Sequence, residues 1–170
     1  MTQSSSRTPG LRPFLPGDAA ALAELCLASI QELAAEDYSE AQQEAWAESI
    51  VVDGFAERLA RSLTLVATVD GAPVGFIALR DNRHVDLFYV HPQAAGQGVG
   101  ALLYDAIERL ARARGAGLLT ADVSDNARGF FDRRGFMALR RNTVSVGDEW
   151  LANTTMEKPL AASDNGDNPR

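Results

Sequence analysis

The sequence predicts a single mixed α/β domain, in which a mostly antiparallel sheet of about six or seven strands is flanked by about four helices. The chain has 170 residues, of which 46% are hydrophobic and 23% charged, as in an ordinary globular domain. Segments with the period of two typical of strands alternate along it with segments of helical period. Residues 1–10 and 161–170 are small and polar, as in disordered tails, so the folded domain is expected at 11–160.

The folded part is expected to begin with one strand and one helix. An extended segment at 11–15 is followed by a Pro-Gly turn, and Asp18 is a candidate N-cap for the helix. The apolar residues of this helix recur on one face: Leu22, Leu25, Cys26 and Ile30. We expect that face to be core. Cys26 is expected to serve packing, because nothing beside it in the sequence would lower its pKa.

A second helix is predicted from Glu40, because Ser39 and Gln42 form a capping-box pattern. Residues 36–38 then form a polar elbow between the two helices. After this helix the period changes to two. The three strands predicted there, joined by turns at 70–71 and 81–83 into an antiparallel meander, are 63–69, 74–79 and 84–90.

The second half of the chain alternates between helices and strands. Pro92 ends the meander, and a glycine-rich loop leads into a helix with an apolar face over 99–110 that Gly115 can end. The remaining elements predicted are a strand at 118–123, a short helix from the capping residues 124–126 to Arg134, and a closing hairpin of 136–146 and 149–156.

Composition excludes several classes of function. The chain has 16 Lys and Arg against 23 Asp and Glu, a net charge of −7, whereas a general nucleic-acid binder needs a basic surface. One cysteine and two histidines, His84 and His91, rule out an internal disulfide, a cysteine-based zinc site and a multi-histidine metal centre. We therefore expect no metal. No apolar run has the length of a signal peptide or of a membrane span, so we expect a cytoplasmic protein.

Charge is unevenly distributed along the chain. Residues 13–57 contain ten acids and no Lys or Arg before Arg58, whereas 109–141 contains eight arginines against three aspartates. The first segment favours a cation and the second an anion. The alternative is that these side chains are simply solvated on helix surfaces.

The most informative segment joins a strand to a helix and runs Val90-His91-Pro92, then three residues, then Gly96-x-Gly98-x-Gly100. Alternating glycines allow successive N–H groups to point inward, and the helix N-terminus adds its dipole. This pattern favours a phosphate or pyrophosphate ligand. It lacks both the Gly-Lys-Ser/Thr of a P-loop and the glycine spacing of a dinucleotide fold. The alternative is that the glycines serve only a tight connection.

These residues resemble the acetyl-CoA pyrophosphate loop of the GNAT superfamily of N-acetyltransferases. The segment from Asn126 to Phe136 resembles the family's next motif, and the two motifs come in the family's order. The resemblance covers about residues 11 to 160. It implies a GNAT-like sheet that splays between the strands 84–90 and 118–123, with the pantetheine of acetyl-CoA inserted in the gap.

The resemblance also implies which residues contact the cosubstrate. The amides of 96–101 would hold the pyrophosphate, the backbone of Tyr89 and Val90 would contact the pantetheine and the thioester carbonyl, and Asn126 would contact the cofactor arm unless it only caps its helix. Arginines of 128–134 could meet the CoA phosphates. The cofactor-contacting set is Tyr89, Val90, Gly96, Gln97, Gly98, Val99, Gly100, Ala101, Asn126 and Phe131.

The chain departs from the family pattern at two positions. Ala95 stands where the family usually has Arg or Gln, so one side-chain contact to the pyrophosphate is missing. Phe131 stands where many members have a Tyr that protonates the departing thiolate. Another group or water must then act as the acid, or the thiolate leaves unassisted, which its modest basicity allows.

An acceptor amine with a pKa near ~10 is protonated at neutral pH, so a base is useful. Strand alternation places His84 and Asp86 on one face with Phe88, and Val85 with Leu87 on the other. Asp86 is our first candidate for the base and His84 the second, acting directly or through water. The alternative for Asp86 is a structural ion pair or hydrogen bond.

In the family, the two N-terminal helices and their elbow line the acceptor side, which here is the acidic segment. This implies a cationic amine, either a small molecule or a peptide, with Tyr38 and Trp46 as part of its wall unless they are core. The sequence therefore predicts an acetyl-CoA-dependent N-acetyltransferase that works by direct transfer in a ternary complex. We expect a monomer or a homodimer, with the hairpin 136–158 as its edge, and neither nucleic acid nor membrane as a partner. The competing hypotheses are a non-catalytic acyl-CoA sensor of the same fold and a protein that binds another nucleotide's pyrophosphate.

Overall fold

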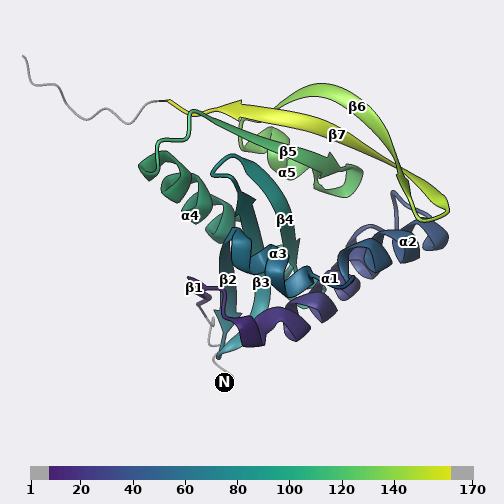
Figure 1. Cartoon of the computed structure of the whole chain (residues 1–170), viewed down its shortest axis with the longest axis horizontal. Helices are drawn as coiled ribbons and strands as arrows, with labels where there is room; N and C mark the ends of the chain where they lie inside the picture. The colour runs from purple at the N-terminus through teal and green to yellow at the C-terminus, as the bar shows by residue number, and fades with distance from the viewer. Residues whose placement is uncertain (1–7, 162–170) are drawn as a thin grey trace, which may run out of the picture.

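The computed structural model describes residues 8–161 and shows helices on both faces of one sheet (Figure 1). Most of the predicted tails, residues 1–7 and 162–170, lie outside the described residues. The predicted N-terminal tail, residues 1–10, extends too far, because Gly10 already pairs with Thr68 in the sheet. Within the described part, the seven strands follow the order β1-β2-β3-β4-β5-β7-β6.

Strand predictions agree closely with the structure, and the mixed, mostly antiparallel sheet is confirmed. The only parallel pair among the described strands is β4 with β5. The strands are β1 (Gly10–Pro13), β2 (Leu63–Val69), β3 (Ala72–Arg80), β4 (His84–Val90), β5 (Leu118–Ser124), β6 (Met137–Val146) and β7 (Glu149–Pro159).

The helices include one that the sequence did not predict. They are α1 (Ala19–Leu33), α2 (Glu40–Ile50), α3 (Phe55–Arg61), α4 (Val99–Ala113) and α5 (Arg128–Arg133), with short 3₁₀ helices η1 (Pro16–Asp18), η2 (Pro92–Ala94) and η3 (Asp125–Ala127). The unpredicted one is α3. It has seven residues and only two buried apolar side chains, Phe55 and Leu59, which is too little pattern to show a period.

Two hydrophobic clusters on opposite faces of the sheet fix the positions of the helices. The predicted apolar face of α1 is buried against Val66 of β2, together with residues of α2 and α3. Leu65 and Ala67, the neighbours of Val66, point the other way and pack with α4 and Phe131 of α5. Helices α1 to α3 therefore cover one face, and α4 and α5 cover the other.

Capping was predicted correctly for α2 and wrongly for α1. Ser39 Oγ accepts the Gln42 N–H at 3.1 Å, and Gln42 Oε1 accepts the Ser39 N–H at 2.9 Å. The Asp18 side chain does not cap α1, because η1 precedes that helix and places the carboxylate elsewhere. It accepts the Leu15 N–H at 2.8 Å and two hydrogen bonds from Arg12, at 2.7 and 2.8 Å.

Strands β4 and β5 are paired only at their start, which confirms the predicted splay. Two residue pairs join them, His84 with Thr120 and Val85 with Ala121. Beyond Val85 the strands separate, as seen between the β4 and β5 labels in Figure 1. The edge of β4 that faces β5 is therefore without a strand partner over most of its length. None of the helices in the described residues is long and apolar enough to cross a membrane.

Candidate active site

A cleft of about 660 Å³ opens where β4 and β5 separate. One wall comes from α1, α2 and α3, and the opposite wall from β5, the start of α5 and the β6–β7 hairpin. The cleft brings together most of the single residues that the sequence singled out as candidates. These are Tyr38, Trp46, Asp86, Tyr89, Val90, Gly100, Asn126 and Phe131.

The glycine loop ends at this cleft. Gly96 and Gly98 have φ angles of +75° and +81°, in the left-handed region that favours glycine. The Leu102 N–H donates to the Gly98 carbonyl as the first bond of α4, so the amides before Leu102 at this end have no partner within the helix. Gly100 borders the cleft, and a Cβ there would lie 3.5 Å from the Phe130 ring. A positive helix end with unpaired amides thus faces the gap between the strands.

A β-bulge at Asp86 corrects the predicted alternation along β4. The register shifts between Ala78, which pairs with Leu87, and Leu79, which pairs with Val85, so Asp86 is an extra residue in the ladder. Val85 consequently packs on the same side of the sheet as Phe88, not with Leu87. Simple alternation could not reveal this, because one inserted residue reverses the faces on either side of it.

The bulge directs Asp86 to Arg58 of α3. Arg58 donates from Nε and Nη2 to the two carboxylate oxygens, at 2.7 and 2.8 Å, and Arg80 Nη1 lies 3.5 Å away. Burial acts to raise the pKa of Asp86, but the hydrogen bonds and charge of Arg58 outweigh it and hold the pKa below its usual value. Asp86 is therefore an ionised, paired carboxylate. Arg58 was not among the predicted site residues, because the helix that carries it, α3, was not predicted.

His84 lies beside the cleft without lining it. Its Nδ1 is 2.8 Å from Thr120 Oγ1, at the point where β4 and β5 are still paired. Burial is the main cause that lowers the pKa of His84, so the imidazole is neutral at neutral pH. Only a relay through water or another group could connect it with the cleft.

Three aromatic side chains form the helix wall of the cleft. Trp46 Nε1 donates to Tyr89 Oη at 3.1 Å, and the Tyr38 and Trp46 rings meet edge to face at 5.4 Å. Tyr38 and Trp46 line the cleft and also pack on buried clusters, so they are core residues, and their role as an acceptor wall stays a prediction. For Tyr89 the sequence predicted a role of the backbone only, and the contact of its side chain with Trp46 was not predicted.

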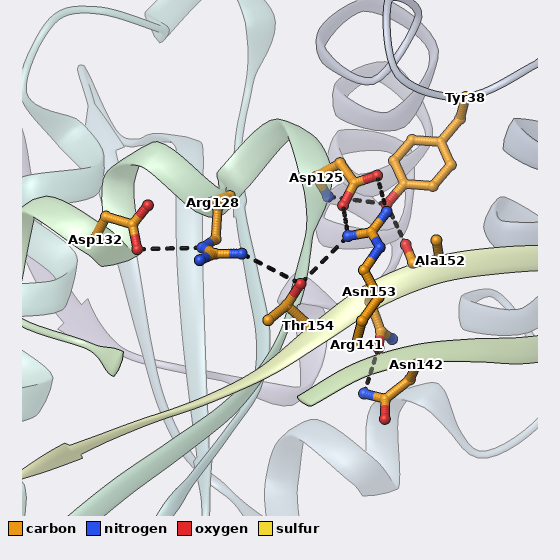
Figure 2. Close-up of polar contacts among 9 residues, drawn as sticks. All are labelled: Tyr38, Asp125, Arg128, Asp132, Arg141, Asn142, Ala152, Asn153 and Thr154. Carbon is orange, nitrogen blue, oxygen red and sulfur yellow. Dashed lines mark hydrogen bonds and ion pairs between the residues drawn. The ribbon is translucent and has the colours of Figure 1, made fainter. Parts of the chain in front are cut away.

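Figure 2 shows how the Tyr38 hydroxyl joins the two sides of the cleft. It donates to the Ala152 carbonyl at 2.6 Å and accepts the Asp125 N–H at 2.9 Å. The Asp125 carboxylate in turn accepts two hydrogen bonds from Arg141, at 2.7 and 2.8 Å. This network ties the elbow between α1 and α2 to β7 and to the loop before α5. The sequence contains no local signal for this network, because Tyr38 and Ala152 are 114 residues apart in the chain.

Asn126 follows directly on Asp125 and lines the cleft. Its alternative interpretation as a helix cap is wrong, because η3 and α5 have no side-chain capping bonds. Two of the three nearby arginines have acidic partners. Arg128 pairs with Asp132 at 3.2 Å, and Arg134 pairs with Asp105.

Phe131 closes the cleft on the side of α5. It is 5% exposed, and its ring meets that of Phe136 edge to face at 4.9 Å.

Cys26 is fully buried in the cluster under α1, as predicted from its helix face, and this burial raises the pKa of its thiol.

The ten acids of residues 13–57 do not form the wall of the cleft. Asp18 is buried in its pair with Arg12, and the other nine acids are exposed on the outside of the helices. The charged residues that line the cleft are Arg58, Asp86 and Asp122. Thr155 Oγ1 donates to the Asp122 carboxylate at 2.7 Å.

Comparison with known proteins identifies several similar chains. Residues 34–160 match the family model of the acetyltransferase (GNAT) domain. An uncharacterized N-acetyltransferase, YafP of Escherichia coli K12, is 31% identical over 146 residues, which cover 86% of this chain and 93% of the relative. A crystal structure of a GCN5-related N-acetyltransferase from Rhodopseudomonas palustris is 54% identical, with a TM-score of 0.86 over 94% of this chain and 99% of that one. The PaiA N-acetyltransferase of Thermoplasma acidophilum, solved with coenzyme A, shares the fold at 22% identity, with a TM-score of 0.74 over 90% and 99% of the two chains.

Proposed function

The chain belongs to the GNAT family of acetyltransferases, and we propose that its cleft binds acetyl-CoA and transfers the acetyl group directly to a primary amine in a ternary complex. The observation that carries this proposal is the combination of two features. Strands β4 and β5 separate after two residue pairs, and the glycine loop ends at the gap they leave. A phosphate group and an extended arm would fit this arrangement.

The backbone supplies the groups that would hold the cosubstrate. Amides of residues 96–101 at the N-terminus of α4 would bind the pyrophosphate, assisted by the helix dipole. The unpaired edge of β4 near Tyr89 and Val90 would bind the pantetheine. An amide there would also polarise the thioester carbonyl and stabilise the charge that develops on its oxygen. Asn126 and Phe131 would border the same arm from α5.

We propose Asp86 as the base that takes the amine proton, with His84 behind it in a water relay. Asp86 lines the cleft and Arg58 keeps it ionised, so the carboxylate is in its proton-accepting form at neutral pH. The departing thiolate needs no dedicated acid from α5. Free thiols have pKa values near ~8.5, so a thiolate is a weak base and leaves readily without the phenol that Phe131 lacks.

The acceptor enters from the side of α1 and α2, where Tyr38 and Trp46 form its wall. Nine exposed acids on the outer surface of this part of the chain support an amine that is cationic in solution. A cytoplasmic location and a monomeric or homodimeric state remain predictions from the sequence.

Release of CoA thiol from acetyl-CoA, measured against a panel of primary amines, tests this function. We expect release that depends on both protein and amine, and calorimetric binding of acetyl-CoA to the protein alone. A non-catalytic sensor would bind acetyl-CoA and release no thiol with any amine. Stabilisation by another nucleotide and none by CoA would point to the third hypothesis.

A further inference from the structure

The acceptor wall of the cleft is largely apolar. At the end away from the glycine loop, helices α1 and α2 and the β6–β7 hairpin surround the space that the pyrophosphate and its arm would leave free. The apolar side chains that line this end are Ile30, Leu33, Trp46, Ile50, Val146 and Leu151. They enclose the reacting amine in a space fit for a flat or branched hydrocarbon body.

Two of the three charges that line the cleft are paired with each other. Asp86 accepts from Nε and Nη2 of Arg58, and Arg80 lies 3.5 Å from the same carboxylate, so Asp86 has no charge left to offer a ligand. Asp122 stands at the opposite wall on β5 and accepts a hydrogen bond from Thr155. Among the described residues, Asp122 is therefore the single carboxylate that lines the cleft without a cationic partner.

This charge balance is unfavourable to a polycation. Asp122 can pair with one ammonium group, but each further ammonium group must give up water, and the apolar wall offers it no carboxylate in return. A monoamine brings only one ammonium group that must give up water, and its charge is lost when the reaction removes the proton. The acids outside the cleft would still attract a single positive charge from solution.

We propose that the acceptor is a monoamine whose amino group is attached to an apolar, ring-sized body, such as an arylalkylamine, and not a polyamine or an aminoglycoside. This inference rests on the proposed function, because it concerns the acceptor of that same cleft. The aromatic rings of Tyr38, Trp46 and Tyr89 would pack against the body of the acceptor.

Acceptor kinetics at saturating acetyl-CoA test the proposal. We expect kcat/KM for 2-phenylethylamine to exceed that for ethylamine, putrescine, spermidine and kanamycin at least tenfold. Ethylamine has the same amino group without the ring, so it isolates the contribution of the apolar body. A higher kcat/KM with any polyamine or with kanamycin would overturn the proposal.

Leu33→Glu places a carboxylate on the acceptor wall at a position that is 38% exposed, so the fold should tolerate it. We expect this variant to lower kcat/KM for 2-phenylethylamine about tenfold and to reduce the preference over spermidine. Leu15→Glu is the matched control, because Leu15 is 56% exposed and does not line the cleft. It should keep the selectivity of the original chain. Equal selectivity in both variants would show that this wall does not choose the acceptor.

Calorimetry on the protein saturated with CoA separates failure of this inference from failure of the proposed function. We expect 2-phenylethylamine to bind and spermidine not to bind. If CoA binds but no amine releases thiol, the transferase function fails, and the binding preference still decides the inference. Binding of spermidine without 2-phenylethylamine would overturn the inference whatever the activity.

Discussion

Arg58 lowers the pKa of Asp86, and with Asp86 as the proposed base it would also shape the pH dependence of the reaction. The pKa of Asp86 lies below its ordinary value of 3.8, so the carboxylate is ionised throughout the neutral range. A group with a lowered folded-state pKa stabilises the fold above its ordinary pKa, and this stabilisation is lost as the pH falls through the lowered value. The same pair therefore contributes to stability above about pH 4.

Asp86→Asn should leave acetyl-CoA affinity unchanged and lower turnover by one to two orders of magnitude, most strongly near neutral pH. At that pH the acceptor amine is protonated and needs a base, whereas near its pKa of ~10 the free amine is abundant. Rates measured from pH 6 to pH 10 check this. An unchanged rate would remove Asp86 from the role of base.

The variant Arg58→Gln tests the role of Arg58 separately from that of Asp86, the proposed base. Without the arginine, the pKa of Asp86 should rise because burial is no longer offset, and the acid limb of the rate profile should move to higher pH. If the pair were purely structural, Asp86→Asn and Arg58→Gln would lose equal amounts of activity, and the pH profile of the rate would not move.

Tyr38→Phe should destabilise the fold by about 1–3 kcal/mol, because it leaves the Ala152 carbonyl and the Asp125 N–H without their partner. Urea unfolding measures this loss. Tyr104→Phe is the comparison variant, since the Tyr104 hydroxyl interacts with Glu108 of the same helix, α4, and joins no separate elements, so its removal should cost less. Equal losses in the two variants would contradict a bridging role for Tyr38.

At the scale of elements, the glycine loop works through backbone conformation. Gly98 is the N-cap of α4 with a φ of +81°, and nothing lies within 4 Å of the position that a Cβ would take. Gly71, in the turn between β2 and β3, has the same φ and the same open surroundings. Both positions are therefore equally strained by a β-branched residue, but only one faces the proposed pyrophosphate site.

Gly98→Val should abolish measurable acetyl-CoA binding, because the side chain enters the space of the pyrophosphate and the strain displaces the first amides of α4. Gly71→Val should lose a similar amount of stability and keep its affinity for acetyl-CoA. Calorimetric titration of both variants is the measurement. Normal affinity in Gly98→Val would refute this location for the pyrophosphate.

Elements with a strong local signal were predictable from the sequence, and those fixed by distant contacts were not. The Ser39 and Gln42 capping box and the apolar face of α4 act within one turn or one helix, so a local pattern shows them. Helix α3 is too short for a period, and the bulge at Asp86 depends on the register with β3. The contact between Arg58 and Asp86 depends on both α3 and this bulge. The sequence therefore could not show that Arg58 is the partner of Asp86.

For the whole molecule, the same distinction explains why the glycine loop could be predicted from the sequence and the composition of the opposite end of the cleft could not. The glycine loop is one continuous segment, and its backbone geometry follows from residue type. The proposed acceptor wall combines α1, α2, α3, β6 and β7, which only the complete fold brings together. The acidic segment indicated a charged wall, but its charges lie outside, because an amphipathic helix buries its apolar face.

The two parts of the sheet meet through two residue pairs between β4 and β5, so a ligand that binds between these strands should stabilise the whole domain. Acetyl-CoA at one hundred times its Kd should add about 2.7 kcal/mol of stability. For a chain of this size that corresponds to a rise in Tm of roughly 5–10 °C. Thermal unfolding with and without acetyl-CoA tests this, with Gly98→Val as the variant expected to show no shift. Amides of β4 beyond Val85 should also exchange more slowly with ligand, because they face the gap. A rise in Tm without protection of these amides would place the ligand elsewhere on the protein.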